Sequence, residues 1–276
     1  MENKKNDFYI GWKSEAPDAF AQKIKKFIWI ILFVVPIVAM SLVLSQQGFE
    51  DSNFEFGTLT AVEGTLFLEP VPMIKTMENG KIKTILLVGF GKIGAEKTFE
   101  AYLEKNPDKK TALNNADIKL NGTLIYHDGK TLLELTEGIN SIIKWENKSA
   151  KFNTQTKALG TATLRGEIYD PKCAFGVMKP GYGKPHRSCA VRCISGGIPP
   201  VLKIENKNGE KNYCILLGEN GDPINKEILD YVADQVQVCG RLEQQDDWLF
   251  FYTDPRSDIL RLQPHFIEGE LPLCSD

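Results

Sequence analysis

A cluster of histidine and cysteine side chains marks the segment KPHRSCAVRCISGG, residues 184–197. It places His186, Cys189 and Cys193 close together in a chain that has only 3 histidines and 6 cysteines. Cys173 precedes them, across the glycine- and proline-containing stretch MKPGYGKP. Thiolates and imidazoles bind soft metal ions, and thiols also form disulfides or react as nucleophiles. These four residues are therefore the candidate site.

The segment predicts a short helix that carries three of these side chains. Pro185 can open a helix and the Gly-Gly pair with the prolines after it ends one, so we expect a helix at about 185–195. His186, Cys189 and Cys193 fall at positions i, i+3 and i+7, on one face. Residues seven apart are about 10.5 Å apart along an ideal axis. His186 and Cys193 can therefore share one ion, at bond lengths of about 2.1 and 2.3 Å, only if the first turn unwinds.

Three chemistries fit these residues. The first is a metal site, the second is a disulfide from Cys173 to one of the helix cysteines, and the third is a redox-active thiol with a lowered pKa. We follow the metal site, because a purely structural disulfide would not require His186. Four such ligands suit zinc when the site is closed, and copper when a thioether or an open position takes part. The candidate metal ligands are Cys173, His186, Cys189 and Cys193, with Met178 as a further soft ligand.

The remaining cysteines and histidines are expected to have smaller roles. Cys214 and Cys239 lie on predicted strands, either as a second disulfide or as two buried thiols. Cys274, near the C-terminus, either pairs or stays reduced. His127, beside a hairpin turn, and His265, in a polar tail, are expected at the surface.

An apolar run, FIWIILFVVPIVAMSLVL at residues 27–44, lies close to the N-terminus. About 20 apolar residues cross a bilayer, so the run predicts a transmembrane helix over residues 27–45. The 26 residues ahead of it and the exit SLVLSQQG, a poor cleavage match, favour an uncleaved anchor over a signal peptide. The chain is therefore expected to be a single-pass membrane protein held in the lipid bilayer.

Basic residues predict the orientation in the membrane. Six lysines precede the run, whereas no basic residue follows it before Lys75. Lysine and arginine are retained on the cytoplasmic side, so residues 1–26 are expected in the cytoplasm. The anchor would lie in the inner (cytoplasmic) membrane with the C-terminal domains outside the cytoplasm, which is the periplasm in a Gram-negative cell.

The rest of the chain contains a weak internal duplication. Each half reads as strand, strand, helix and then a hairpin with alternating apolar residues. OB barrels, the small barrels of the oligonucleotide/oligosaccharide-binding type, have a comparable makeup. The order predicts a mainly β (α+β) fold with two tandem OB-like barrels, at residues 46–150 and 151–276. The segments are VEGTLFLEP, KTILLVG, AEKTFEAYLEK and IKLNGTLIYHDGKTLLEL in the first half, and TLRGEIYDP, NYCILLG, NKEILDYVADQ and VQVCGRLEQQDDWLFFYT in the second.

The two halves differ by an insertion of about 40 residues ahead of the NYCILLG strand, and this insertion contains the candidate site. The corresponding stretch of the first half, PVPMIKTMENGK, has no cysteine or histidine. The first barrel is therefore expected to be a scaffold or docking barrel, and the second to be the functional one.

The segment VGFGKIG, residues 88–94, matches the dinucleotide fingerprint Gly-x-Gly-x-x-Gly between a strand and a helix. A Rossmann unit continues into a parallel strand that ends in an acidic residue, whereas this chain continues into a hairpin. We therefore expect no nucleotide and interpret the glycines as a tight turn. With 33 basic against 36 acidic side chains, the composition gives no support for a nucleic-acid partner.

The segments GEIYDPKC, GVMKPGYGKPHRSCAVRCISGGIPP and the following ILLG strand resemble a family of uncharacterised exported bacterial proteins. In that family a glycine-rich loop leads to His-x-x-Cys-Ala-x-x-Cys and then Gly-Gly-x-Pro. The resemblance covers roughly residues 163–220. It implies an exported, membrane-attached chain and marks the four candidate ligands, but it implies no activity.

The anchor, the outside location and the soft ligands predict a metal-binding or redox accessory subunit. Its expected partners are other subunits of a membrane oxidoreductase or electron-transfer assembly, and zinc or copper is the expected ion. A thiol-disulfide redox protein and a disulfide-stapled structural scaffold are the alternatives. The sequence has no serine nucleophile elbow, paired-carboxylate signature or zinc-protease motif, so it gives no support for hydrolysis.

Overall fold

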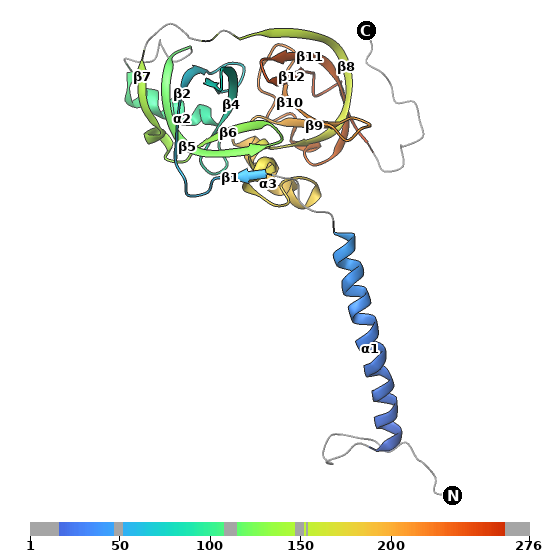
Figure 1. The fold of residues 1–276 in the computed structure, drawn as a ribbon. Coiled ribbons are helices and arrows are strands. Elements are labelled where there is room, and N and C mark those ends of the chain that lie inside the picture. The colour runs from blue at the N-terminus through green and yellow to red at the C-terminus, as the bar shows by residue number, and fades with distance from the viewer. Residues whose placement is uncertain (1–16, 47–51, 108–114, 147–151, 153, 263–276) are drawn as a thin grey trace, which may run out of the picture. The chain divides into compact units, whose positions relative to one another are not determined.

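The computed structural model describes residues 17–46, 52–107, 115–146, 152 and 154–262. The chain forms two structural units, residues 1–50 and 51–276. The first contains one long helix, and the second contains two β-barrels together with the helical turns of the candidate site (Figure 1).

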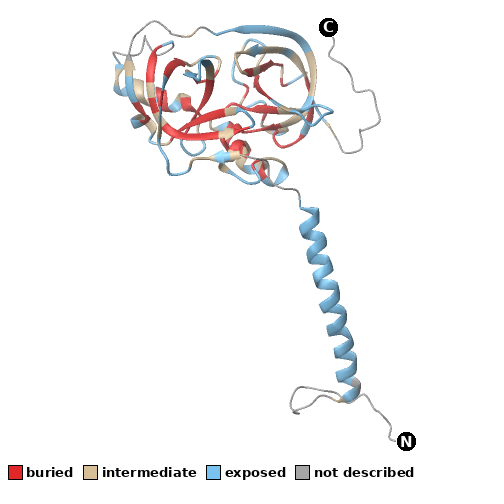
Figure 2. Ribbon diagram, in the orientation of Figure 1, coloured by how far each residue is buried: buried red, intermediate tan, exposed pale blue. Residues whose placement is uncertain are grey.

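Helix α1 spans Asp18–Ser45 and is exposed throughout its described length (Figure 2). The part Phe20–Ser45 has 26 residues and a mean hydropathy of 2.9. At 1.5 Å per residue it is about 39 Å long, which exceeds the ~30 Å hydrocarbon core of a bilayer. The predicted apolar run is therefore a helix long enough to cross a membrane. Lys4, Lys5 and Lys13, on which the predicted orientation partly depends, lie outside the described residues.

The first barrel is a closed ring of five strands. Strands β2 and β3, β3 and β4, β5 and β6, and β5 and β2 pair antiparallel, and the parallel pair β4–β6 closes the ring. Helix α2 (Ala95–Lys105) lies between β4 and β5 in sequence. Two short strands, β1 (Ser52–Phe54) and β7 (Ile142–Glu146), add to β5. The ring strands are β2 (Thr60–Phe67), β3 (Met73–Glu78), β4 (Lys81–Gly89), β5 (Asp117–His127) and β6 (Lys130–Leu135).

The second barrel repeats this order of pairing. Strands β8 and β9, β9 and β10, β11 and β12, and β11 and β8 pair antiparallel, and the parallel pair β10–β12 closes the ring. A short strand β13 (Ile259–Arg261) adds to β11. The ring strands are β8 (Thr156–Tyr169), β9 (Val201–Glu205), β10 (Lys211–Leu217), β11 (Gln235–Gln245) and β12 (Trp248–Tyr252).

These pairings confirm the predicted fold of two OB-like barrels after an apolar helix. In each ring the strands are joined in the order first, second, third, fifth, fourth, with a parallel contact between the third and the fifth. Alternating apolar residues fill the inside of each barrel. The repeated order of the first, third, fourth and fifth strands, which the sequence analysis recognised in both halves, is what made the fold predictable.

The two barrels also share a hydrophobic core (Figure 2). Leu86 and Leu132 from the first barrel and Tyr213 and Phe250 from the second belong to it, and all four are buried. Across this contact the Trp248 indole N–H donates a hydrogen bond of 3.0 Å to the carbonyl of Thr84. The barrels therefore pack directly on one another.

The helix predicted at residues 225–235 is wrong. Only a single 3-10 turn, Leu229–Tyr231, forms there, and β11 begins at Gln235. Ile224, Ile228 and Val232 have helical spacing and are all buried, which explains the mistaken periodicity. Ala233 has a φ of 60°, outside the helical region, and its N–H donates to the carbonyl of Ile168 instead.

The sequence analysis also missed the second strand of each barrel, β3 and β9. Strand β3 joins β4 through Asn79 and Gly80, whose φ values of 50° and 76° suit a two-residue hairpin turn. This Asn-Gly pair lies within PVPMIKTMENGK, which was interpreted only as a counterpart of the insertion. Strand β9 lies within the stretch that was interpreted as the insertion, and its apolar run VLKIE is too short to stand out.

Candidate metal centre

The four predicted ligands come from three short elements between β8 and β9. Cys173 begins a helical turn, Cys173–Val177, just after β8 ends. His186 ends a 3-10 turn that leads into helix α3 (Arg187–Ser195), which carries Cys189 and Cys193. The predicted helix at about 185–195 is therefore present, with its first turn wound more tightly.

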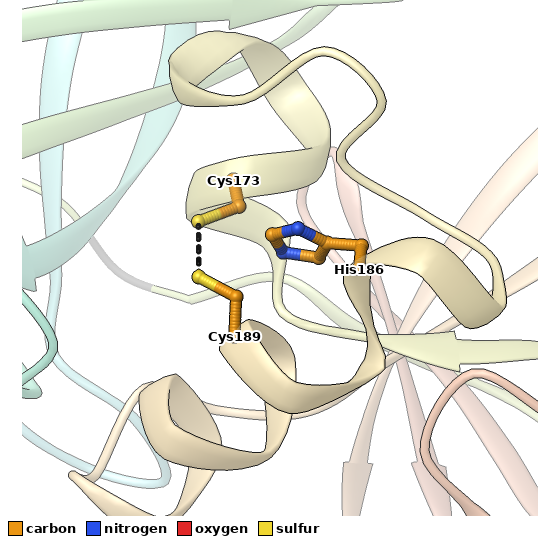
Figure 3. A group of neighbouring side chains, drawn as sticks. All are labelled: Cys173, His186 and Cys189. Carbon is orange, nitrogen blue, oxygen red and sulfur yellow. Dashed lines mark hydrogen bonds between the residues drawn. The ribbon is translucent and has the colours of Figure 1, made fainter.

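Three of the four side chains meet. The ligand atoms of Cys173, His186 and Cys189 all lie within 4.8 Å of one another. The two sulfur atoms are 3.9 Å apart, and the His186 ring points towards the gap between them (Figure 3). Cys173 and His186 are buried and Cys189 is half-buried. This is a compact set of two thiols and one imidazole.

Cys193 belongs to a second set around the same Cys173. Its ligand atom lies within 4.8 Å of those of Cys173 and Asp170. His186 and Cys193 do not share a set among the described residues, as their separation along the helix predicts. Cys173 is thus the residue common to both groups.

Asp170 organises the site, and the sequence analysis did not identify it. One carboxylate oxygen accepts a hydrogen bond of 2.9 Å from the backbone N–H of Cys173, and the other lies 3.1 Å from Nε2 of His186. The side chain is fully buried. A carboxylate that orients a histidine is a common partner of metal-binding imidazoles. The pattern Asp-Pro-x-Cys could have revealed it, because Asp followed by Pro is typical of a helix N-terminus.

The loop between Cys173 and His186 needs glycine where it crosses back over the first turn. A Cβ atom at Gly181 would collide with the carbonyl oxygen of Cys173 and lie 2.6 Å from Cα of Ala174. Gly183 has a φ of 73°, which favours glycine. These two glycines let the chain return so that His186 reaches Cys173.

An ionic cluster holds the start of helix α3 against the second barrel. The buried carboxylate of Asp234 binds Lys184, and it also binds Arg187 at 3.0 Å and Arg261 at 2.9 Å. Arg187 and Arg261 also donate to the backbone carbonyl of Asp230. Because Lys184 and Arg187 flank His186, this cluster fixes where the imidazole lies.

The first barrel contributes to the site, whereas the sequence analysis assigned the chemistry to the second barrel alone. Its glycine-containing loop brings Lys92 to the cysteines, with Nζ 3.4 Å from the sulfur of Cys189. The N–H of Gly94 donates to the carbonyl of Gly196 at the end of α3. Gly91 has a φ of 71°, so the expected tight turn is confirmed at this position. The loop thus docks on the site helix.

A buried ion pair fixes the same loop from the side of the second barrel. Nζ of Lys172 lies 2.6 Å from a carboxylate oxygen of Glu134 and donates to the carbonyls of Gly89 and Gly91. Lys172 and Glu134 are both buried. The pair therefore joins the barrels directly beside Cys173.

A pocket of about 400 Å³ opens over the sulfur atoms. Cys173, Cys189 and Cys193 line it together with Met178. Its other walls are largely apolar and come in part from the first barrel. They include Phe54, Phe56, Leu59, Phe90 and Val177.

The thiols differ in acidity because they are hydrogen-bonded to one another. The hydrogen bond from Cys173 lowers the pKa of Cys193, helped by Cys189 and by the positive charge of Lys92. The same contact with Cys193, together with burial, raises the pKa of Cys173. Without a metal ion, negative charge in this pair is therefore favoured on Cys193.

The other candidate residues lie elsewhere. His127 is buried, not at the surface as predicted, because its ring stacks on Phe175 and its Nε2 lies 2.9 Å from the hydroxyl of Tyr213. No disulfide joins Cys214 to Cys239. The predictions for His265 and Cys274 concern residues outside the described part of the chain.

Comparisons with known proteins give no function. No protein-family model matches the sequence, and no curated protein matches it. Among solved structures, the chain is similar to the "tetrameric p202 HIN2" at 11% identity and a TM-score of 0.20, covering 79% of this chain and 100% of that one. The fold and the site therefore rest on the strand pairings and side-chain distances given above.

Proposed function

We propose that this chain is a membrane-anchored protein that holds a soft metal ion, zinc or copper, at the site built around Cys173. The observation that carries the proposal is the sulfur separation of 3.9 Å between Cys173 and Cys189, with His186 beside both. Two thiolates bound to a tetrahedral zinc ion at 2.3 Å are about 3.8 Å apart. The side chains are therefore spaced as for shared coordination.

The surroundings support the same conclusion. Asp170 holds His186 through one ring nitrogen, which leaves the other as a ligand. Nζ of Lys92 lies 3.4 Å from the sulfur of Cys189, so a positive charge borders the site where thiolate ligands would bind the ion. Cys193 lies beside Cys173, so a third thiol borders the site.

The cellular setting belongs to the same proposal. Helix α1 serves as the anchor, and the two barrels lie outside the cytoplasm, where the protein acts as an accessory subunit of a membrane oxidoreductase or electron-transfer assembly. The test is purification of the tagged full-length chain from gently solubilised membranes. Co-purification of other membrane subunits is the expected result, and a chain that purifies alone contradicts this part.

Metal analysis tests the site itself. The full-length chain, purified in detergent without added metal or reductant, should contain about one zinc or copper ion per chain, as expected for a single closed or open centre. Cys173→Ser and Cys189→Ser should lose the ion. Cys239→Ser is the matched control, because Cys239 lies on β11 beside Thr163. An ion that survives both site substitutions contradicts the assignment.

Thiol-disulfide exchange is the second candidate, because Cys173 contacts two thiols, Cys189 and Cys193. A thiol count on the same preparation, after a chelator has removed any bound metal, separates the two functions. Loss of two thiols among these three residues, recovered by a dithiol, together with turnover of a disulfide substrate, supports exchange. Reactive thiols that bind metal and do not turn over support the metal centre.

A further inference from the structure

We propose that the ion at this centre keeps one coordination position open towards the pocket, and that this position takes a small molecule with an anionic donor atom on an apolar body. The inference rests on the proposed function, because it requires the ion. It adds a ligand-binding role to a metal centre that could otherwise be purely structural.

The ligands lie on one side of the ion. His186 is 2% exposed and does not line the pocket, whereas Cys173 and Cys189 do. An ion bound by these three residues therefore has the imidazole behind it and the pocket on its sulfur side. A three-ligand zinc site with one position open is the arrangement found where zinc binds an exchangeable molecule.

Cys193 also lines the pocket, so its position decides whether the fourth coordination position is open. Its sulfur groups with Cys173 and the carboxylate of Asp170, not with His186 and Cys189. To close the coordination shell, it would have to approach the imidazole from the next turn of α3. The open position therefore requires that Cys193 stays beside Cys173 and Asp170 when the ion binds.

The size and walls of the pocket select an apolar body. Its volume of about 400 Å³ falls in the range of small-molecule sites and far exceeds the ~30 Å³ that one water occupies. Phe54, Phe90 and Val177 present carbon surface to it. A ligand that buries an aromatic or branched aliphatic group there gains from removing that group from water.

The charges select an anionic donor. The positive charge of Lys92 lines the pocket 3.4 Å from Cys189, whereas the carboxylate of Asp170, which holds His186, does not line the pocket. Lys172 also lines the pocket, but its charge is balanced by Glu134 at 2.6 Å. A thiolate or a similar anion in the fourth position would lie on the side of Lys92 and be attracted by its charge.

Cobalt(II) is a suitable probe, because its visible spectrum reports the number and type of ligands in a zinc-like site. The full-length chain in detergent is loaded with cobalt(II) and titrated with benzenethiolate, and separately with the hydrophilic 2-sulfanylethanesulfonate. We expect both to change the cobalt bands. Benzenethiolate should bind about tenfold more tightly, since its ring is buried on binding.

Variants assign that preference to the pocket. Phe90→Ser should reduce the preference for benzenethiolate, whereas Met77→Ser, an exposed apolar residue on β3 outside the pocket, should keep it. Lys92→Met should weaken binding of both thiolates, because it removes the positive charge at the pocket wall. Equal affinities for the two thiolates in the unaltered chain contradict an apolar pocket site.

The same experiment distinguishes failure of the metal centre from failure of the open coordination position. If cobalt gives thiolate charge-transfer bands that neither added thiolate changes, the metal centre stands and the open position is wrong. If Cys193→Ser removes a share of the charge-transfer intensity, Cys193 occupies the fourth position and the open position is again wrong. If cobalt gives no such bands, both the metal centre and this inference fail.

Discussion

Asp170 and His186 form a buried pair, with 3.1 Å between the carboxylate oxygen and Nε2. The other oxygen of Asp170 accepts the N–H of Cys173, so one carboxylate sets the positions of two candidate ligands. Asp170 therefore positions two candidate ligands although it is not among the predicted metal ligands itself.

Replacing Asp170 with asparagine should therefore weaken metal binding while both ligands remain. We expect Asp170→Asn to lower the affinity for zinc or cobalt(II) by about 10- to 100-fold, as for other residues that orient a metal-binding histidine. Competition with a chromogenic chelator measures it. Asp222→Asn, in an exposed turn, is the matched control and should bind as the unaltered chain does. Equal affinity in both variants contradicts the role of Asp170.

The cluster around Asp234 predicts a stability effect centred on the start of α3. Asp234→Asn weakens the contacts to Lys184, Arg187 and Arg261, and should lower the free energy of unfolding by about 2 kcal/mol. Urea unfolding measures the loss. Asp230→Asn is the control, because Asp230 contacts the two arginines through its backbone carbonyl, which the substitution retains. A similar loss in the control contradicts the prediction.

The ion pair between Lys172 and Glu134 predicts that substitutions of the two residues have non-additive effects on the free energy of unfolding. Lys172→Met leaves the buried carboxylate unpaired, and should lower the free energy of unfolding by about 3–5 kcal/mol. Adding Glu134→Gln removes the unpaired charge and should recover part of that loss. Lys83→Met serves as the surface control, since Lys83 pairs with an exposed Glu78 at 2.7 Å and should cost only about 0–1 kcal/mol. Strict additivity of the two buried substitutions contradicts the ion pair.

Cys214 predicts how stability depends on alkaline pH. Burial raises the pKa of its thiol to about 12, whereas a thiol in the unfolded chain has a pKa of about 8.5. Above the unfolded pKa, the unfolded chain loses the proton and the folded chain keeps it. The contribution to stability is therefore full below that pH and decreases by about 1.4 kcal/mol per pH unit until the folded pKa is reached.

Urea unfolding at a neutral and at an alkaline pH tests this. The unaltered chain should lose more stability between the two conditions than Cys214→Ala does. Cys239→Ala, at a half-buried thiol of the same barrel, should keep the larger loss. The same pH dependence with and without the Cys214 thiol contradicts the prediction.

Several features could be predicted from the sequence because their signals are local. The apolar run of residues 27–44 forms part of α1, since every turn of a helix in this stretch is apolar. Alternating apolar residues and turn signals predicted the barrel strands, and Pro185 with Gly196 correctly bounded the short helix. The prediction failed at Asn79 and Gly80, where the turn signal was present but was not used, and at residues 225–235.

The sequence by itself determined that Cys189 and Cys193 lie on one face of a helix and that His186 and Cys193 cannot share one ion on a regular helix, because both follow from helix geometry. Only the tertiary structure decided which residues complete the site. Asp170 reaches His186 from the end of a strand, and Lys92 reaches Cys189 from the other barrel, 97 positions away in sequence. Such contacts depend on how two barrels pack around a shared core, and no local pattern of residues encodes that packing.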